Sequence, residues 1–162
     1  MTTTTSLTAG TWTIDTTRSR AGFTARGLGH TVTGSIPVTA ATVEIDADGQ
    51  PTRFTARLDP AGIETGNARR DKDLRGKRFL KAEAHPLMEV TADRIEPTGT
   101  GWKADATIRV AGAEASLRID GVLTGTQVIG TAYLDIRTVG IKAPGFMVGR
   151  RVDITVSAEL DR

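Results

Sequence analysis

The segment Trp102-Lys-Ala-Asp-Ala-Thr-Ile-Arg-Val-Ala-Gly-Ala-Glu-Ala-Ser-Leu-Arg-Ile-Asp-Gly-Val-Leu123 decides the fold class. Apolar and polar side chains alternate along it, which is the period of a β-strand with one buried face. The alternation is interrupted at Ala111-Gly112, a dipeptide suited to a tight turn. We therefore predict two antiparallel strands, one beginning at Trp102 and one over residues 115–123. Their apolar faces carry Ala104, Ala106, Ile108, Val110, Leu117, Ile119 and Leu123.

The same alternation continues on both sides of this hairpin, with turn residues between the runs. Many short strands joined by tight turns are typical of an all-β sandwich or barrel, in which sequence neighbours pair antiparallel. The Asp-Gly pair that ends at Gly49 is a strong turn signal. Further strands are predicted over residues 11–15, 21–25, 32–38, 41–45, 53–59, 88–92, 128–137 and 151–160.

Two features favour closure into an up-and-down barrel of about eight strands. A barrel leaves no exposed edge, which suits long regular strands with few prolines. The predicted inward faces are also rich in small residues, and aromatic residues make up only 4% of the chain. A barrel lined in this way can keep an apolar lumen that holds a ligand, whereas a tighter, alanine-lined core would leave no void. The small inward residues are Ala21, Ala25, Ala56, Ala92, Ala104, Ala106, Gly130, Ala132 and Ala158.

One stretch, residues 65–81, departs from the strand pattern. Its segment 69–81 holds seven basic residues against two acidic ones, a charge of 7 − 2 = +5, so the rest of this +2 chain sums to 2 − 5 = −3. Asn67 is suited to cap a helix and Gly76 to a left-handed position after it, which predicts a helix over 68–75 and a further turn near 78–81. The stretch is either a solvated connector or a lid that offers cations to an anionic ligand.

Length and composition predict one domain without disulfides. The 162 residues can bury a sizeable core, and cysteine is absent. No leader pattern or membrane-spanning window is visible, so we expect a cytoplasmic protein without stable membrane insertion. A net charge of +2 and few aromatic residues argue against a nucleic-acid partner. The sequence is compatible with both a monomer and a homodimer.

Motifs for catalysis are missing from the sequence. It contains no nucleophile elbow, no zinc-protease helix and no phosphate-binding loop. His30 and His85 lie far apart with no obvious third ligand, so we predict neither a metal nor a cofactor. The carboxylates most central in the chain stand beside basic residues, which favours ion pairing. Trp12 and Trp102 each lie near a strand start, where a large ring commonly plugs a barrel end.

A family resemblance rests on motifs spread from residue 10 to residue 160. They are Trp12-Thr-Ile-Asp15 with Ser19, Phe23 and Gly34, then Ile63-Glu-Thr-Gly-Asn67 with Arg70-Asp71 and Leu74, then Phe79 and His85-Pro86, and finally Asp135-Ile-Arg137 with Gly140-Ile141. In this order they resemble the YceI-like family. Three positions depart from its frequent pattern: Arg18 replaces a histidine, Asp73 replaces another, and Val139 replaces an aromatic residue.

The resemblance implies a lipocalin-like antiparallel barrel that binds long polyisoprenoid chains such as prenyl phosphates and quinones. On this basis residues 1–9 are expected to form a disordered tail and 10–162 a single YceI-like barrel domain. The expected function is non-catalytic binding, storage or transport of an isoprenoid or similar lipid. One alternative is a catalytic barrel, which would act as a hydrolase or isomerase of a small apolar substrate and use a central carboxylate. The other alternative is an interaction module with a filled core.

Candidate ligand-binding residues follow from the alternation and from the basic stretch. The predicted lumen residues are Phe23, Phe54, Leu58, Val90, Ala106, Ile108, Leu117, Ala132, Leu134 and Val156. The predicted mouth residues are Arg69, Arg70, Leu74, Arg75, Phe79 and Phe146.

Overall fold

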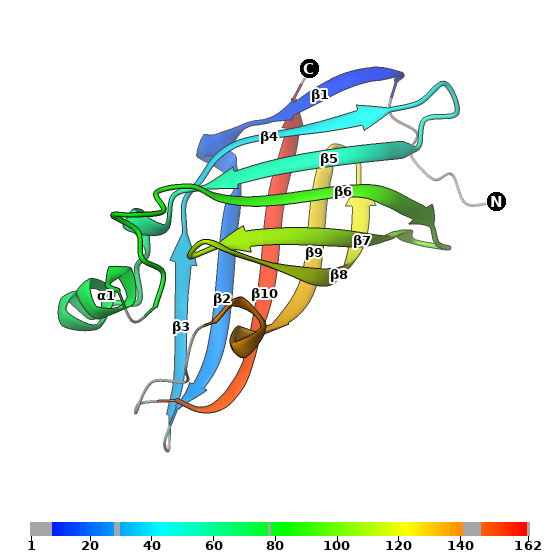
Figure 1. Cartoon of the computed structure of the whole chain (residues 1–162). Helices are drawn as coiled ribbons and strands as arrows, with labels where there is room; N and C mark the ends of the chain where they lie inside the picture. Colours follow the sequence, from blue (N-terminus) through cyan, green and yellow to red (C-terminus); the bar gives the residue numbers. More distant parts are fainter. Residues whose placement is uncertain (1–7, 28–29, 78, 141–146, 162) are drawn as a thin grey trace.

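The computed structural model describes residues 8–27, 30–77, 79–140 and 147–161, with side chains left undescribed at 26–30 and 147–150. It contains ten strands, three 3-10 turns and one helix in these residues (Figure 1). The strands are β1 (Gly10–Ile14), β2 (Arg20–Gly27), β3 (His30–Ile36), β4 (Val38–Ile45), β5 (Pro51–Leu58), β6 (Met88–Pro97), β7 (Gly101–Val110), β8 (Ala113–Thr124), β9 (Gln127–Asp135) and β10 (Met147–Asp161).

The strands close into an antiparallel eight-stranded barrel. The pairing runs β1-β4-β5-β6-β7-β8-β9-β10, and β1 pairs with β10 to complete the ring. The additional hairpin β2–β3 continues two of these strands: β2 follows β1 and pairs with β10, while β3 precedes β4 and pairs with β2. Each of the first two barrel strands is thus broken into two pieces, and the up-and-down order predicted from the sequence is confirmed.

Both breaks have a local cause. Between β1 and β2, the Asp15 side chain accepts a hydrogen bond from the Thr17 backbone N–H at 3.0 Å and starts the 3-10 turn η1 (Thr16–Arg18). Between β3 and β4 stands Pro37, which has no N–H to donate to a sheet. The prediction of one strand over 32–38 was therefore wrong, because the strand is interrupted at this proline.

Another predicted strand is also shorter than expected. The alternation suggested residues 128–137, but β9 ends at Asp135 and the 3-10 turn η3 (Ile136–Val139) follows. The Asp135 side chain accepts a hydrogen bond from the Arg137 backbone N–H at 3.0 Å, which caps this turn and ends the strand. β8 and β9 are paired from Asp120 opposite Thr131 toward their shared turn.

The basic stretch forms the helix α1 (Ala68–Arg75), as predicted. Asn67 caps it by accepting a hydrogen bond from the Arg70 backbone N–H at 3.0 Å. The prediction for the C-terminal end was wrong, because Gly76 is extended, with φ −78°, and Lys81 takes the left-handed conformation, with φ +50°. The carbonyl of Gly76 accepts from the backbone N–H groups of Phe79 and Lys81, so the reversal comes several residues later than expected.

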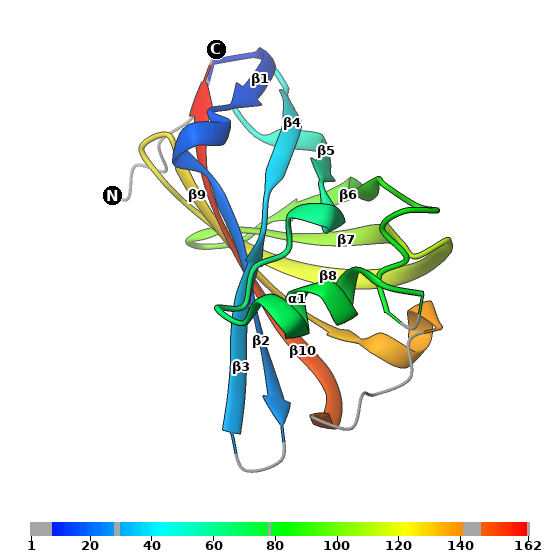
Figure 2. The same ribbon diagram turned by 90° about the vertical axis from the view of Figure 1, so that its left-hand side faces the viewer.

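The core lies inside the barrel and is continuous with a smaller cluster at one end. The larger cluster contains residues such as Leu58, Ile108 and Leu117, whereas the smaller one is built on Ile45 and Leu160. The 3-10 turn η2 (Pro60–Gly62) and the helix α1 connect β5 to β6 at the end of the barrel opposite the smaller cluster. In the view of Figure 2, α1 lies in front of β2 and β3. None of the helices in the described ranges is long and apolar enough to cross a membrane.

Candidate functional site: an apolar cavity inside the barrel

The barrel contains a cavity of about 320 Å³. This volume is at the lower end of the range of small-molecule sites in proteins. Side chains from every strand of the barrel line it, and apart from Thr42, Thr131 and the indole N–H of Trp102 no lining side chain carries a polar group. No charged residue contributes to the wall. Such a cavity can hold hydrocarbon but offers almost no hydrogen bond to a buried polar ligand.

Most of the predicted lumen residues line this cavity. The alternation predicted them correctly because inward positions in a barrel repeat at every second residue. Ala106 is different: it is buried, 5% exposed, and packs in the core, but it does not contribute to the cavity wall. The predicted residues in the wall are Phe23, Phe54, Leu58, Val90, Ile108, Leu117, Ala132, Leu134 and Val156.

The segment around α1 closes one end of the cavity, which we call the helix end. Leu74 on α1 and Phe79 in the following turn line the cavity, as predicted for mouth residues. Leu80 and Ile63 join them in the wall. The polar helix therefore contributes an apolar underside to the lumen through Leu74.

The three predicted mouth arginines stay outside the cavity wall. Arg70 is half-buried, and its guanidinium donates to the Thr65 hydroxyl and carbonyl, both at 2.9 Å. Arg75 donates a long hydrogen bond of 3.5 Å to the carbonyl of Ala61, and Arg69 is exposed. Arg70 and Arg75 thus form hydrogen bonds within the segment 61–75 that surrounds them. Phe146 lies outside the described residues.

A buried carboxylate fixes the helix end to the strands. Asp71 is 7% exposed, and its side chain accepts from the Thr65 N–H at 2.8 Å and from the Thr65 hydroxyl at 2.5 Å. The neighbouring Glu64 exchanges two backbone hydrogen bonds with Ser35 on β3, each 2.9 Å long. This close approach requires Gly34, since a Cβ there would lie 2.5 Å from the Glu64 carbonyl oxygen. Residues 64–71 are therefore joined to β3 by a short polar chain of contacts.

The opposite end, which we call the tryptophan end, is closed by packed side chains. Trp102 lines the cavity and lies over Gly121, where an added Cβ would come within 2.9 Å of the indole ring. Trp12 packs against the Ile45–Leu160 cluster, and its indole N–H donates to the Thr8 carbonyl at 2.9 Å. Both rings close this end of the barrel, as the sequence predicted.

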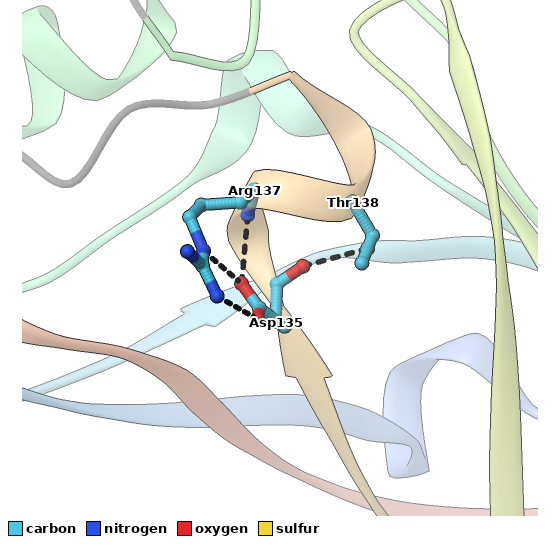
Figure 3. Close-up of polar contacts among 3 residues, drawn as sticks. All are labelled: Asp135, Arg137 and Thr138. Carbon is cyan, nitrogen blue, oxygen red and sulfur yellow. Dashed lines mark hydrogen bonds and ion pairs between the residues drawn. The ribbon is translucent and has the colours of Figure 1, made fainter.

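None of the carboxylates considered for catalysis lines the cavity. Asp71 is engaged by Thr65, and Glu64 and Asp73 are exposed. Asp135 forms an ion pair with Arg137, 3.1 Å between Oδ2 and the guanidinium (Figure 3). The hydrogen bond from the Arg137 side chain, with a further one from its backbone N–H, holds the pKa of Asp135 below its ordinary value. Asp135 is thus a charged turn residue on the surface.

A second, more polar hollow lies on the surface beside His85. Gly112 brings the turn after β7 against the imidazole, and Arg109 pairs with Glu114 across the hollow at 3.0 Å. In the described part of the chain no three His, Cys, Asp or Glu side chains gather in a way that could hold a metal ion. The side chain of His30 is not among those described.

Several cavity residues were not on the predicted list. Ile14, Val38, Met88 and Ile154 belong to strands, and the same alternation could have found them. Leu80 lies in a turn, where no period marks which side chain points inward, whereas Ile136 lies in η3 but continues the alternation of Ala132 and Leu134. The position of Leu80 depends on how the turn folds back over the barrel end.

Fold and cavity together define a closed antiparallel β-barrel with an apolar lumen. The family model for the YceI-like domain matches residues 12–160, and the chain belongs to this family. No curated protein gives a significant match.

Solved structures support the same fold at low sequence identity. BcnA from Burkholderia cenocepacia superposes with a TM-score of 0.73 at 13% identity, covering 91% of this chain and 98% of that one. A polyisoprenoid binding domain from Saccharophagus degradans, described as implicated in plant cell wall breakdown, gives 0.69 at 12% identity, with 93% and 97% covered. The YceI protein of Campylobacter jejuni gives 0.65 at 15% identity, with 80% and 81% covered.

Proposed function

We propose that this protein binds a long hydrocarbon chain of isoprenoid type in the barrel lumen and stores or carries it without changing it chemically. The observation that carries the proposal is the cavity of about 320 Å³ with its apolar wall. The structural likeness to a domain described as polyisoprenoid-binding supports the same ligand class.

The energetics of chain burial support this function. Each buried CH₂ group contributes about 0.8 kcal/mol, so some ten carbons supply about 8 kcal/mol before ordering costs. That is about the free energy of micromolar binding. An isoprenoid tail can therefore be held without any charged contact in the wall, and a polar head group would stay outside the cavity.

The catalytic alternative has no supporting observation among the described residues. A hydrolase or isomerase needs a group within hydrogen-bond reach of the bound substrate. The central carboxylates Glu64, Asp71, Asp73 and Asp135 do not contribute to the cavity wall, and alanine substitution of any of them should leave lipid binding essentially intact.

A titration with a fluorescent farnesol derivative tests the lumen as the binding site. The wild type should bind it with saturable affinity, and unlabelled farnesol should displace it. The Ala132→Phe variant should lose binding, because the ring would occupy the cavity that Ala132 lines. Equal binding by wild type and variant would contradict the proposed site.

The head group is the finer part of the proposal. Arg69, Arg70 and Arg75 lie on α1, whose Leu74 lines the cavity. This proximity supports them as partners of an anionic group that emerges at the helix end, with Arg70 first leaving its hydrogen bonds to Thr65. Replacing the three arginines with Gln should weaken binding of a prenyl phosphate by about 1–3 kcal/mol and barely change that of a quinone with a similar tail. Equal weakening of both ligands would mean that the arginines only hold the helix end closed.

A further inference from the structure

The helix end carries exposed cations that have no carboxylate partner. Arg69, Lys72, Lys77 and Lys81 are exposed, and none of them forms an ion pair in the described part of the chain. Of the two acids in the helix, Asp71 is buried and directed at Thr65, and Asp73 is exposed. Asp73 and Glu83 are the exposed acids of the segment 68–83, so its outer surface is strongly positive.

Cations on the barrel wall are arranged differently. At the tryptophan end, exposed basic residues stand directly opposite acids on neighbouring strands, and such cross-strand pairs neutralise each other locally. The register neighbours are Arg53 with Glu44, Arg94 with Asp105, and Lys103 with Glu96 and Asp120; none of these three cations forms an ion pair among the described residues, but each has an acid directly opposite it. The unbalanced positive charge is therefore a property of the helix end and not of the whole surface.

The same segment also forms the wall of the cavity. Leu74 lies between Lys72 and Lys77 in the sequence, and Phe79 and Leu80 lie between Lys77 and Lys81. These three apolar side chains line the lumen, while the lysines around them are exposed. Hydrocarbon contacts and cations thus alternate within ten residues at one end of the barrel.

We infer that the helix end is a docking surface for a bilayer that contains anionic lipids. The inference rests on the proposed function, because a protein that carries a bilayer lipid has to exchange it at the membrane surface. Each Lys near an anionic bilayer is attracted to it, and this attraction falls off within a Debye length. Docking through α1 places the closing residues Leu74, Phe79 and Leu80 at the lipid–water interface, where the chain has to pass.

Vesicle co-sedimentation tests this surface directly. The wild type is mixed with vesicles of phosphatidylcholine alone or with about 30% phosphatidylglycerol, an anionic lipid. The test variant is Lys72→Gln/Lys77→Gln/Lys81→Gln. The matched control is Arg53→Gln/Arg94→Gln/Lys103→Gln, which removes the same charge at the tryptophan end. Thermal melts confirm that both variants are folded.

We expect the wild type and the control to bind anionic vesicles and to release them in high salt. The test variant should lose about tenfold or more of its partition coefficient. An equal loss of vesicle binding in both variants would show that only the net charge of the protein matters and would contradict the inference. A wild type that does not prefer anionic vesicles would also overturn it.

The farnesol titration separates this inference from the proposed function. The test variant should bind the soluble probe like the wild type, since its three lysines do not line the cavity. Vesicle binding without probe binding by the wild type would leave the docking surface standing and refute the lumen site. Probe binding without vesicle binding would support the lumen site and refute the docking surface.

Discussion

The two ends of the barrel are closed by different means. At the tryptophan end, paired strands and the packed rings of Trp12 and Trp102 close the lumen. At the helix end, a short polar helix covers it and is held by hydrogen bonds from Thr65 to the buried Asp71 and by the backbone bridge between Ser35 and Glu64.

This difference indicates which end opens. Opening the tryptophan end would break ladder hydrogen bonds and expose large apolar side chains, whereas moving α1 breaks a few polar contacts and exposes Leu74 and its neighbours. Regions with few buried apolar contacts open locally at a lower free energy than the core. We therefore expect ligands to pass through the helix end. The following predictions test this comparison, starting with the largest effect.

The tryptophan end should tolerate almost no added volume. A Cβ at Gly101 would collide with the Gly121 carbonyl oxygen across the β7–β8 pair, so Gly101→Ala should cost about 3 kcal/mol of unfolding free energy. Gly99 lies in the same turn with no atom within 4 Å of an added Cβ, and Gly99→Ala is the control. Urea unfolding measures both variants. Equal stability of the two would mean that this end is loosely packed.

The lumen should distinguish two alanines on the inward face of the barrel, Ala106 and Ala132. Ala106→Phe should cost about 1–3 kcal/mol, because Ala106 is packed in the core and does not line the cavity. Ala132→Phe should cost less, since its ring can enter the cavity. Thermal melts rank the two variants, and a larger loss for Ala132→Phe would contradict the position of the cavity.

The helix end should loosen when its tether is removed. Asp71→Ala leaves the Thr65 N–H without its acceptor and should lower the local stability of residues 65–77 by about 1–3 kcal/mol. Asp73→Ala, two residues further along, removes an exposed side chain and is the control. Hydrogen exchange of the backbone amides measures the change. Faster amide exchange in the tether variant should accompany faster uptake and release of lipid at an essentially unchanged equilibrium affinity, and unchanged amide protection would show that other contacts hold α1.

The smallest effect concerns pH. Because the pKa of Asp135 is lowered in the folded state, its ion pair with Arg137 stabilises the protein above the unfolded pKa and loses this effect as the pH falls through the lowered value. Both groups are exposed, so the contribution is small. Asp135→Asn should remove a small part of the stability difference between pH 7 and acid, measured by thermal melts. A pH dependence identical to that of the wild type would mean that the pair contributes nothing.

The sequence predicted the features that depend on local pattern. Alternation placed the barrel strands and most of the cavity wall, and the Asn67 cap placed α1. It failed where a turn or an individual side-chain contact decides the outcome. Leu80 enters the cavity because the turn after α1 folds back, and the guanidinium of Arg70 donates a hydrogen bond to Thr65. Neither position has a periodic signal.

Other expectations remain predictions. They are the roles of the proposed ligand contacts, the cytoplasmic location, the homodimer and the disordered N-terminal tail. Residues 1–7 of that tail lie outside the described residues.

Native mass spectrometry of the protein purified without detergent tests the central claim most directly. The account predicts a bound mass that matches an isoprenoid lipid, retained by the wild type and missing from Ala132→Phe. A wild-type protein that carries no lipid and takes up none when incubated with farnesol or a quinone would contradict the claim that this cavity binds an isoprenoid chain.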